Sequence, residues 1–304
     1  GPVVYFVDHF FRDHELIGRL PMEKGDQLHF VDSSSEPEVT RIDAFKEAVS
    51  AADSRTPCCV VGIGGGNALD TAKAVANLLT NPGKAEDYQG WELVKNPAVY
   101  KIGIPTLSGT GSECSRTCVL TNIPKNLKLG MNSDYTVYDQ LLLDPDLLAT
   151  VPRDQYFYTG IDTFMHCVES LQGSYRNAII DAFSVRAVQL CEEIFLSDDM
   201  MSEENREKMM IASYIGGMAA GNVGVIHPFS AGLGVVLHVA HGLGNCLALN
   251  VLGDIYPKEY KQFRTMIERQ GVNLPTGICK DLTEEQYEGL YRGCIVHEKP
   301  LTNA

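Results

Sequence analysis

The sequence predicts an α/β fold for the first half of the chain and an all-α fold for the second half. In the first half, short apolar runs alternate with segments of helical spacing, which is the order of strands and crossover helices in a parallel sheet. In the second half, apolar residues recur every three or four positions over long stretches, as in amphipathic helices. We therefore expect two domains, residues 1–150 and 151–304.

Each element of the first half follows from a local pattern. Short apolar runs bounded by turn residues predict strands, and three- to four-residue spacing predicts helices. Strand and helix alternate, so the strands should be parallel. The expected strands are 2–8, 27–32, 58–64 and 100–106, the expected helices are 39–52 and 68–79, and two shorter β-rich runs at 127–132 and 140–145 close this half.

The second half contains three strongly periodic segments, and each predicts a helix. "VPRDQ" is typical of a helix entry, and Gly173 and Gly221 suit helix ends. The boundary between the halves should lie in "DPDLLATVPR", residues 144–153. The expected helices are 154–172, 178–196 and 203–221.

Composition limits the kinds of partner and compartment. A formal net charge of −14 argues against nucleic acid or an anionic membrane as a partner, because both bind clustered positive charge. The nine cysteines are scattered without a CxxC pair, and no apolar run is long enough to span a bilayer. We expect a cytoplasmic protein in a reducing compartment, and we interpret the abrupt ends of the chain as a sign that it is part of a longer one.

A glycine cluster, "VVGIGGGNALD", follows a predicted strand and opens a predicted helix. Backbone N–H groups at a helix N-terminus attract anions, and glycine lets a phosphate approach closely. Gly64, Gly65, Gly66 and Asn67 are therefore candidates for binding a pyrophosphate, although Asn67 stands where the usual fingerprint has its last glycine. A tight turn without a ligand is the alternative interpretation.

A second loop of small residues, "PTLSGTGSE" at 105–113, follows the next predicted strand and offers the hydroxyls of Thr106, Ser108 and Thr110. Ligands of open α/β sheets bind where the carboxyl ends of neighbouring parallel strands form a crevice. The two loops together predict a Rossmann-like dinucleotide domain. Asp8 ends the first strand and could accept hydrogen bonds from a ribose diol, which favours NAD over NADP, or it could simply cap the next helix.

Asp162 and His166 lie four residues apart in an apolar segment, so both face the same side of a helix. An unpaired buried charge is costly, so either the two satisfy each other or they bind something else. His227 and one of His238 and His241 could join them, and the pattern does not separate the last two. One carboxylate and three imidazoles suit a divalent transition metal, Fe²⁺ or Zn²⁺.

The chain as a whole resembles the iron-containing (group III) alcohol dehydrogenases. The blocks that carry this resemblance occur in the family's order. They are "GIGGGNALDTAK", "IPTLSGTGSE", "LLLDPDLLATVP", "GIDTFMHCVES" and "HPFSAGLGVVLHVAHGLGN". The resemblance implies a dehydroquinate synthase-like architecture, with a Rossmann-like NAD-binding domain followed by a helical domain that binds a catalytic metal.

The resemblance also implies roles for particular residues. Asp162, His166, His227 and His241 match the family's metal ligands, which are also its catalytic centre. His241 is preferred to His238 by the resemblance alone, because it occupies the family's His-Gly-x-x-Asn block. Lys128 matches a lysine near the nicotinamide ribose.

The chain departs from the family pattern at several places. Ala231 stands where many members carry a histidine beside the nicotinamide, and Glu36 stands where many have asparagine. The family's N-terminal β-hairpin and last C-terminal helices are missing, so both termini look truncated relative to the family. The blocks "YQGWELVK", "NSDYTVYDQ" and "GLGNC" look most like the branch of 3-deoxy-D-manno-octulosonate 8-oxidases.

The expected activity is hydride transfer between a primary alcohol and NAD, with the C8 hydroxyl of an acidic octulosonate sugar as a candidate substrate. Two alternatives remain open. One is a dehydroquinate-synthase-like sugar-phosphate cyclase, which would need a Lys/Arg cluster that the helical half lacks near the ligands. The other is a non-catalytic module that binds metal and nucleotide. We also expect a homodimer.

Overall fold

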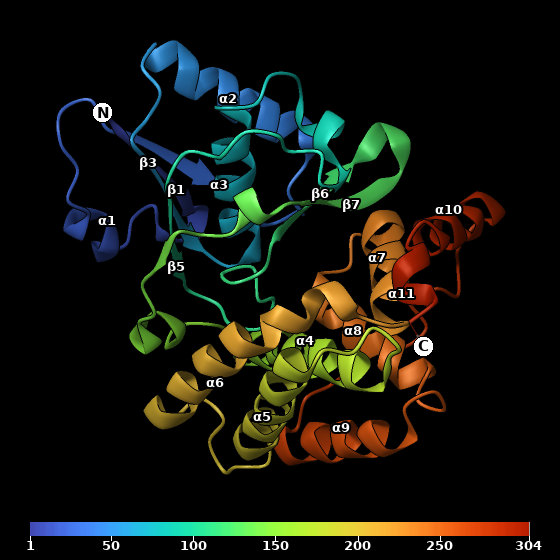
Figure 1. Ribbon diagram of the computed structural model, residues 1–304. Helices are drawn as coiled ribbons and strands as arrows, with labels where there is room; N and C mark the ends of the chain where they lie inside the picture. The colour runs from blue at the N-terminus through green and yellow to red at the C-terminus, as the bar shows by residue number, and fades with distance from the viewer. Residues whose placement is uncertain (304) are drawn as a thin grey trace. The chain divides into compact units, whose positions relative to one another are not determined.

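The computed structural model describes residues 1–303, and the chain divides into two compact units (Figure 1). The first unit contains residues 1–106 and 112–144, and the second contains residues 107–111 and everything from Pro145 onward. The division differs from the predicted domains 1–150 and 151–304 in two respects. The boundary lies between Asp144 and Pro145, six residues before the predicted one. The short segment Leu107–Gly111 belongs to the second unit, although it lies within the first half of the sequence.

The first unit is built on a parallel sheet of five strands in the order β2-β1-β3-β5-β8. This confirms the parallel α/β fold that the alternating pattern predicts. The order reverses at β1, which places a topological switch point at the carboxyl ends of β1 and β3. The strands are β1 Val3–Asp8, β2 Gln27–Val31, β3 Cys59–Gly64, β5 Lys101–Pro105 and β8 Gln140–Leu141.

Helices cover both faces of this sheet, and so its strands are apolar on both sides. Helices α2 (Val39–Ala52) and α3 (Gly66–Leu78) pack on one face, where Ile42 and Val75 join Val60 of β3 in one core cluster. Helix α1 (Glu15–Arg19) covers the other face, on the side of Val61.

A second, smaller sheet in the first unit has the order β4-β7-β6. Its strands are β4 Gly90–Trp91, β6 Thr117–Asn122 and β7 Leu127–Asn132. The run 127–132, which was predicted to be β-rich, forms strand β7. Strand β6 was not predicted; it alternates buried and half-buried residues and pairs antiparallel with β7.

The second unit is helical, as predicted, and helix α4 lies at its centre between α5, α6 and α8 (Figure 1). The predicted helices 154–172 and 178–196 correspond to α4 and α5. The third predicted helix leaves the α conformation at Gly216 and continues as a 3-10 turn to Asn222. The helices are α4 Arg153–Gln172, α5 Ala178–Phe195, α6 Glu203–Gly216, α7 Ile226–Leu237, α8 His241–Val251, α9 Pro257–Gln270, α10 Glu284–Ile295 and α11 Glu298–Leu301.

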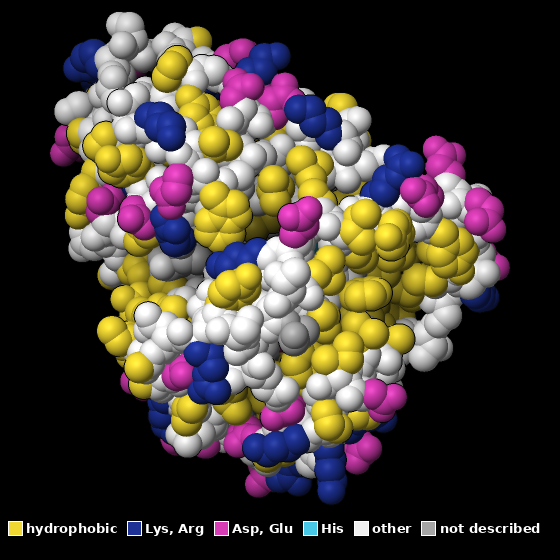
Figure 2. All heavy atoms as spheres, turned by 45° about the vertical axis from the view of Figure 1, so that its right-hand side comes forward, with side chains coloured by type: hydrophobic (Ala, Val, Ile, Leu, Met, Phe, Trp, Pro, Cys, Tyr) yellow, Lys and Arg dark blue, Asp and Glu magenta, His cyan; other side chains and the backbone are white. Residues whose placement is uncertain are grey.

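Short 3-10 helices connect the main elements; they are η1 His9–Phe11, η2 Ala85–Tyr88, η3 Ile123–Lys125, η4 Asp134–Thr136, η5 Pro145–Leu148 and η6 Gly217–Asn222. Among the described residues no single helix is long and apolar enough to cross a bilayer, although the bent pair Glu203–Asn222 and Ile226–Leu237 together meets the limits of length and composition. Figure 2 shows hydrophobic side chains gathered on the face of the second unit that carries α10, where Tyr287, Tyr291 and Ile295 are exposed.

Candidate active site

Helix α4 supplies the first two residues of a cluster that could hold a metal. Asp162 and His166 lie one turn apart on it, and their residues are 0% and 4% exposed. Almost every residue from Tyr156 to Ser170 is buried, because α4 is enclosed by other helices. The polar pair therefore lies in an apolar environment from which bulk water is excluded.

The other two residues of the cluster lie at the starts of α7 and α8. His227 is in the first turn of α7, and His241 is the first residue of α8. Between them, His238 ends α7 in a left-handed conformation with φ 54° and is exposed. This turn directs the chain back toward the cluster at His241, and it leaves His238 in solvent.

The four side chains converge on a single point. The Nε2 atoms of His166, His227 and His241 lie 3.5, 3.2 and 3.6 Å from Oδ1 of Asp162. One ligand atom from each of the four residues lies within 4.8 Å of all the others. The structure thus brings together Asp162, His166, His227 and His241, and His238 is not part of the group.

The chemistry of this cluster fits a divalent transition metal. The second oxygen of Asp162, Oδ2, is buried and has no hydrogen-bond partner among the described residues. A buried carboxylate oxygen without a partner is costly unless a cation is bound beside it. Three imidazole nitrogens and one carboxylate are ligands that Fe²⁺ and Zn²⁺ accept.

The protonation states of the cluster are consistent with this ligand set. Burial alone would raise the pKa of Asp162, but the three histidines around it lower that pKa well below its usual value, so the carboxylate is anionic. Burial lowers the pKa of His166 to about 4, which makes its imidazole neutral at pH 7. Burial would also lower the pKa of His227, but Glu169 and Asp162 raise it to about 9, so a metal would have to displace a proton there.

Three further polar groups hold the ligands in place. Asn245 donates from Nδ2 to Oδ1 of Asp162 at 2.6 Å. The hydroxyl of Ser230 lies 3.2 Å from Nδ1 of His241, and Glu169 is hydrogen-bonded to Nδ1 of His227. None of these three groups was predicted from the sequence. A signal existed for Glu169, because it follows Asp162 by seven residues and so lies on the same face of α4.

The predicted pyrophosphate turn lies at the switch point of the sheet. Gly64 ends β3 with φ 152°, and a Cβ there would lie 2.6 Å from Cβ of Ala68 and 2.9 Å from Cβ of Asp8, so only glycine fits. Gly65 is the N-cap of α3 and Gly66 its first residue, and no side chain in the described part of the chain caps this helix start. Its first amides are thus available to an anion.

Polar residues next to this turn already have partners in the first unit. The carboxylate of Asp8 accepts from the amide of Phe10 at 3.0 Å and from the hydroxyl of Ser33 at 2.8 Å, so the simple capping role is present. Asn67 donates to the carbonyl of Ser35 at 2.8 Å. Lys128 forms an ion pair with Glu36 at 2.9 Å. Its ammonium group would contact a ribose only if it separated from Glu36.

The second predicted loop is divided between the two units. Thr106 belongs to the first unit and donates its amide to the carbonyl of Gly64 at 3.0 Å. Ser108 and Thr110 belong to the second unit, so the structure does not bring the three hydroxyls together in one unit. Within the second unit, Gly109 is hydrogen-bonded to Thr163 of α4 and to Ser213 of α6, which explains the assignment of this segment.

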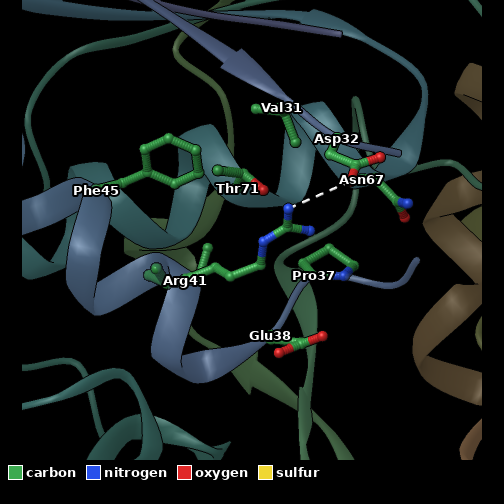
Figure 3. Close-up of a pocket in the computed structure, with 9 residues that line it drawn as sticks. Val31, Asp32, Pro37, Glu38, Arg41, Phe45, Asn67 and Thr71 are labelled. Carbon is green, nitrogen blue, oxygen red and sulfur yellow. Dashed lines mark hydrogen bonds and ion pairs between the residues drawn. The ribbon is translucent and has the colours of Figure 1, made fainter. Parts of the chain in front are cut away.

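A small pocket that the sequence analysis missed lies in the first unit, at the end of β2 (Figure 3). Asn67 lines it, and the guanidinium of Arg41 points toward Asp32 at 3.4 Å. Hydrogen bonds from Ser34, with a smaller effect of Arg41, lower the pKa of Asp32 to about 2, so this carboxylate is anionic. An acid at the end of the second predicted strand was the signal available in the sequence.

With this fold and cluster in view, the comparison with known families is clear. Residues 14–145 match the iron-containing alcohol dehydrogenases, and residues 156–289 match the C-terminal part of the Fe-containing alcohol dehydrogenase family. The chain belongs to the iron-containing alcohol dehydrogenase family. The resemblance stated from the motifs is thereby confirmed at the level of the family, whereas the octulosonate branch remains a prediction.

Particular relatives come from several organisms. The sulfoacetaldehyde reductase of Bilophila wadsworthia is 34% identical over 220 residues, which is 70% of this chain and 56% of the relative. The NAD-dependent methanol dehydrogenase of Bacillus methanolicus is 32% identical over 208 residues, which is 67% of this chain and 53% of the relative. The matched part of the chain thus spans a little over half the length of these two relatives.

Solved structures share the fold. The crystal structure of a sulfoacetaldehyde reductase from Bifidobacterium kashiwanohense in complex with NAD⁺ superposes with a TM-score of 0.82 at 25% identity, and it covers 99% of this chain and 86% of that one. An archaeal halo-thermophilic alcohol dehydrogenase from a Red Sea brine pool has a TM-score of 0.85 at 17% identity, covers 99% of this chain and 88% of that one, and so shows the fold alone.

Proposed function

We propose that the protein is a metal-dependent alcohol dehydrogenase that transfers a hydride between a primary alcohol and NAD. The observation that carries this proposal is the convergence of three imidazole Nε2 atoms on the buried carboxylate of Asp162. In a family of iron-containing alcohol dehydrogenases, this arrangement supports His166, His227 and His241 as the other ligands of one Fe²⁺ or Zn²⁺.

A divalent ion held by these four side chains would supply Lewis-acid activation of the alcohol oxygen. The chain supplies the environment for it. Asn245 fixes the orientation of the Asp162 carboxylate, which is 0% exposed and so is shielded from bulk water. Low solvent access strengthens every electrostatic interaction at the centre.

NAD is the proposed cofactor, and the first unit would bind it. The uncapped start of α3 at Gly64, Gly65, Gly66 and Asn67 suits the pyrophosphate. Two acids, Asp8 and Asp32, stand at the carboxyl ends of β1 and β2 and would repel the 2′-phosphate of NADP. The relatives that are NAD-dependent or bound to NAD⁺ support the same choice.

The proposed substrate is a small alcohol or its aldehyde. The names of the relatives include reductases and dehydrogenases of sulfoacetaldehyde, methanol and 1,3-propanediol. The C8 hydroxyl of a 3-deoxy-octulosonate sugar, which the motif branch suggests, is a primary alcohol on an acidic molecule and belongs in the same panel. Alanine at position 231 leaves the proton acceptor to the cofactor ribose or to water.

The test is an NAD-linked assay of this panel with metal-loaded protein. We expect NADH formation with at least one alcohol, or NADH consumption with its aldehyde. Cyclisation of a phosphorylated sugar without net reduction of NAD would identify a cyclase instead. Binding of metal and NAD without turnover of any substrate would identify a non-catalytic module, and either result would overturn the proposal.

Two broader expectations accompany the proposal. We propose that the active protein is a homodimer, which light scattering coupled to size exclusion would detect as twice the mass of one chain. We also propose a cytoplasmic location, for which the thiols of the nine cysteines, none of them in a disulfide among the described residues, are the supporting feature.

A further inference from the structure

Glu169 is a buried carboxylate that is not one of the four candidate ligands, and the resemblance to the family assigned it no role. It is 1% exposed and lies on the same face of α4 as Asp162 and His166. Its Oε1 accepts the amide of Ile226 at 2.6 Å, and its Oε2 is hydrogen-bonded to Nδ1 of His227. The hydroxyl of Tyr256 is a third partner. A charge so deeply buried needs a role that compensates for its desolvation.

We propose that Glu169 is a positioning residue that holds His227 in the ring orientation and tautomer required for metal binding. The proposal rests on the metal centre of the proposed function. A carboxylate that accepts a hydrogen bond from Nδ1–H leaves the Nε2 lone pair for the metal and makes the imidazole a stronger donor. The ring of His227 is then directed so that Nε2 lies 3.2 Å from Asp162.

The geometry around Glu169 limits its motion. The amide of Ile226 holds Oε1, and this amide belongs to the residue directly before His227. The same carboxylate is therefore hydrogen-bonded both to the backbone amide of Ile226 and to the ring of the next residue, His227. Asp162 and Glu169 together place two negative charges in a buried site beside three imidazoles, and a divalent cation would balance both.

The three histidines are consequently not equivalent. Nδ1 of His241 lies 3.2 Å from the neutral hydroxyl of Ser230, which itself donates to the carbonyl oxygen of His241 at 3.0 Å. Nδ1 of His166 is buried without a hydrogen-bond partner among residues 1–303. Nδ1 of His227 is hydrogen-bonded to a carboxylate, so loss of Glu169 should weaken this ligand more than removal of the Ser230 hydroxyl would weaken His241.

A plainer explanation is that Glu169 only caps the start of α7 by accepting the amide of Ile226. Glu169→Gln separates the two explanations. The variant keeps an acceptor for that amide, but it removes the charge and cannot accept from both partners through equivalent oxygens. Ser170→Ala is a matched control, because Ser170 is equally buried on the same helix and its hydroxyl has no partner in the described chain.

The experiment measures Zn²⁺ affinity by competition with a chelator, together with the visible spectrum of the Co²⁺-substituted protein and the thermal unfolding of the metal-free protein. We expect Glu169→Gln to bind Zn²⁺ about 10- to 100-fold more weakly and to change the Co²⁺ spectrum. Ser170→Ala should match the wild type. Glu169→Asp, which keeps the charge, should recover part of the affinity, and it decides the question if Glu169→Gln does not fold.

Wild-type affinity and an unchanged Co²⁺ spectrum in a folded Glu169 variant would overturn the positioning role, whatever happens to its unfolding temperature. That result would leave the proposed metal centre intact. Failure of the wild-type protein itself to bind Zn²⁺ or Co²⁺ would instead overturn the proposed function on which this inference rests.

Discussion

At the scale of single residues, the candidate centre depends on which histidine completes it. His241 points its Nε2 toward Asp162, whereas His238 is exposed at the end of α7. We predict that His241→Ala loses the metal and the NAD-linked activity. His238→Asn should keep both, because asparagine tolerates the left-handed backbone at that position. Metal content and turnover of the two purified variants provide the comparison, and equal losses in both would contradict the assignment.

Cofactor choice is also decided by single residues. A carboxylate and a 2′-phosphate about 4 Å apart in water repel by about 1 kcal/mol, which is roughly a fivefold change in affinity. We predict that Asp8→Asn and Asp32→Asn each improve the use of NADP relative to NAD by about that factor. Asp53→Asn, at the opposite end of α2, is the control. Ratios of kcat/KM for the two cofactors that do not change in either variant would refute this role.

At the scale of elements, the turn between β3 and α3 is sensitive to substitution. A Cβ at Gly64 would collide with Ala68 and Asp8 in a backbone conformation that other residues avoid. We predict that Gly64→Ala weakens NAD binding at least tenfold and lowers the unfolding temperature. Gly18→Ala in α1 has open space around it and should change neither. Calorimetric NAD titration checks this, and wild-type affinity in Gly64→Ala would show that the turn is not the phosphate site.

Elements were predictable from sequence where their pattern is local. The continuous apolar run of β3 predicts a strand buried on both faces, and the periodicity of α4 predicts a buried helix. Strand β6 was not predictable in this way, because it is stabilised by its antiparallel pairing with β7, which a local pattern does not reveal. The helix at 203–221 was predicted too long, because Gly216 packs against Thr163 and Cys167, which a local pattern does not reveal.

The candidate site shows the same limit. The spacing of Asp162 and His166 revealed one half of the cluster, but His238 and His241 have equivalent local contexts and differ only in where the turn after α7 directs them. Ser108 and Thr110 were grouped with the glycine turn by their sequence position. They belong to the other unit, where Gly109 between them donates its amide to Ser213 and accepts from the hydroxyl of Thr163.

At the scale of the whole molecule, the metal ligands all belong to the second unit, and so metal binding should stabilise that unit directly. An ion at about 100 times its dissociation constant stabilises the native state by about 2.7 kcal/mol. We predict that removal of the metal by a chelator lowers the unfolding temperature, and that added Fe²⁺ or Zn²⁺ restores it. In Asp162→Ala the same treatment should have no effect. A chelator effect of equal size in that variant would place the metal elsewhere.

The proposed metal-dependent hydride transfer is tested most directly by the rate of NADH formation from a primary alcohol while metal-free, folded protein is titrated with Fe²⁺ or Zn²⁺. We expect the rate to rise with added metal and to saturate at one ion per chain. A rate that is independent of metal, or a folded protein that binds one ion per chain at these ligands yet reduces no NAD with any alcohol of the panel, would contradict it.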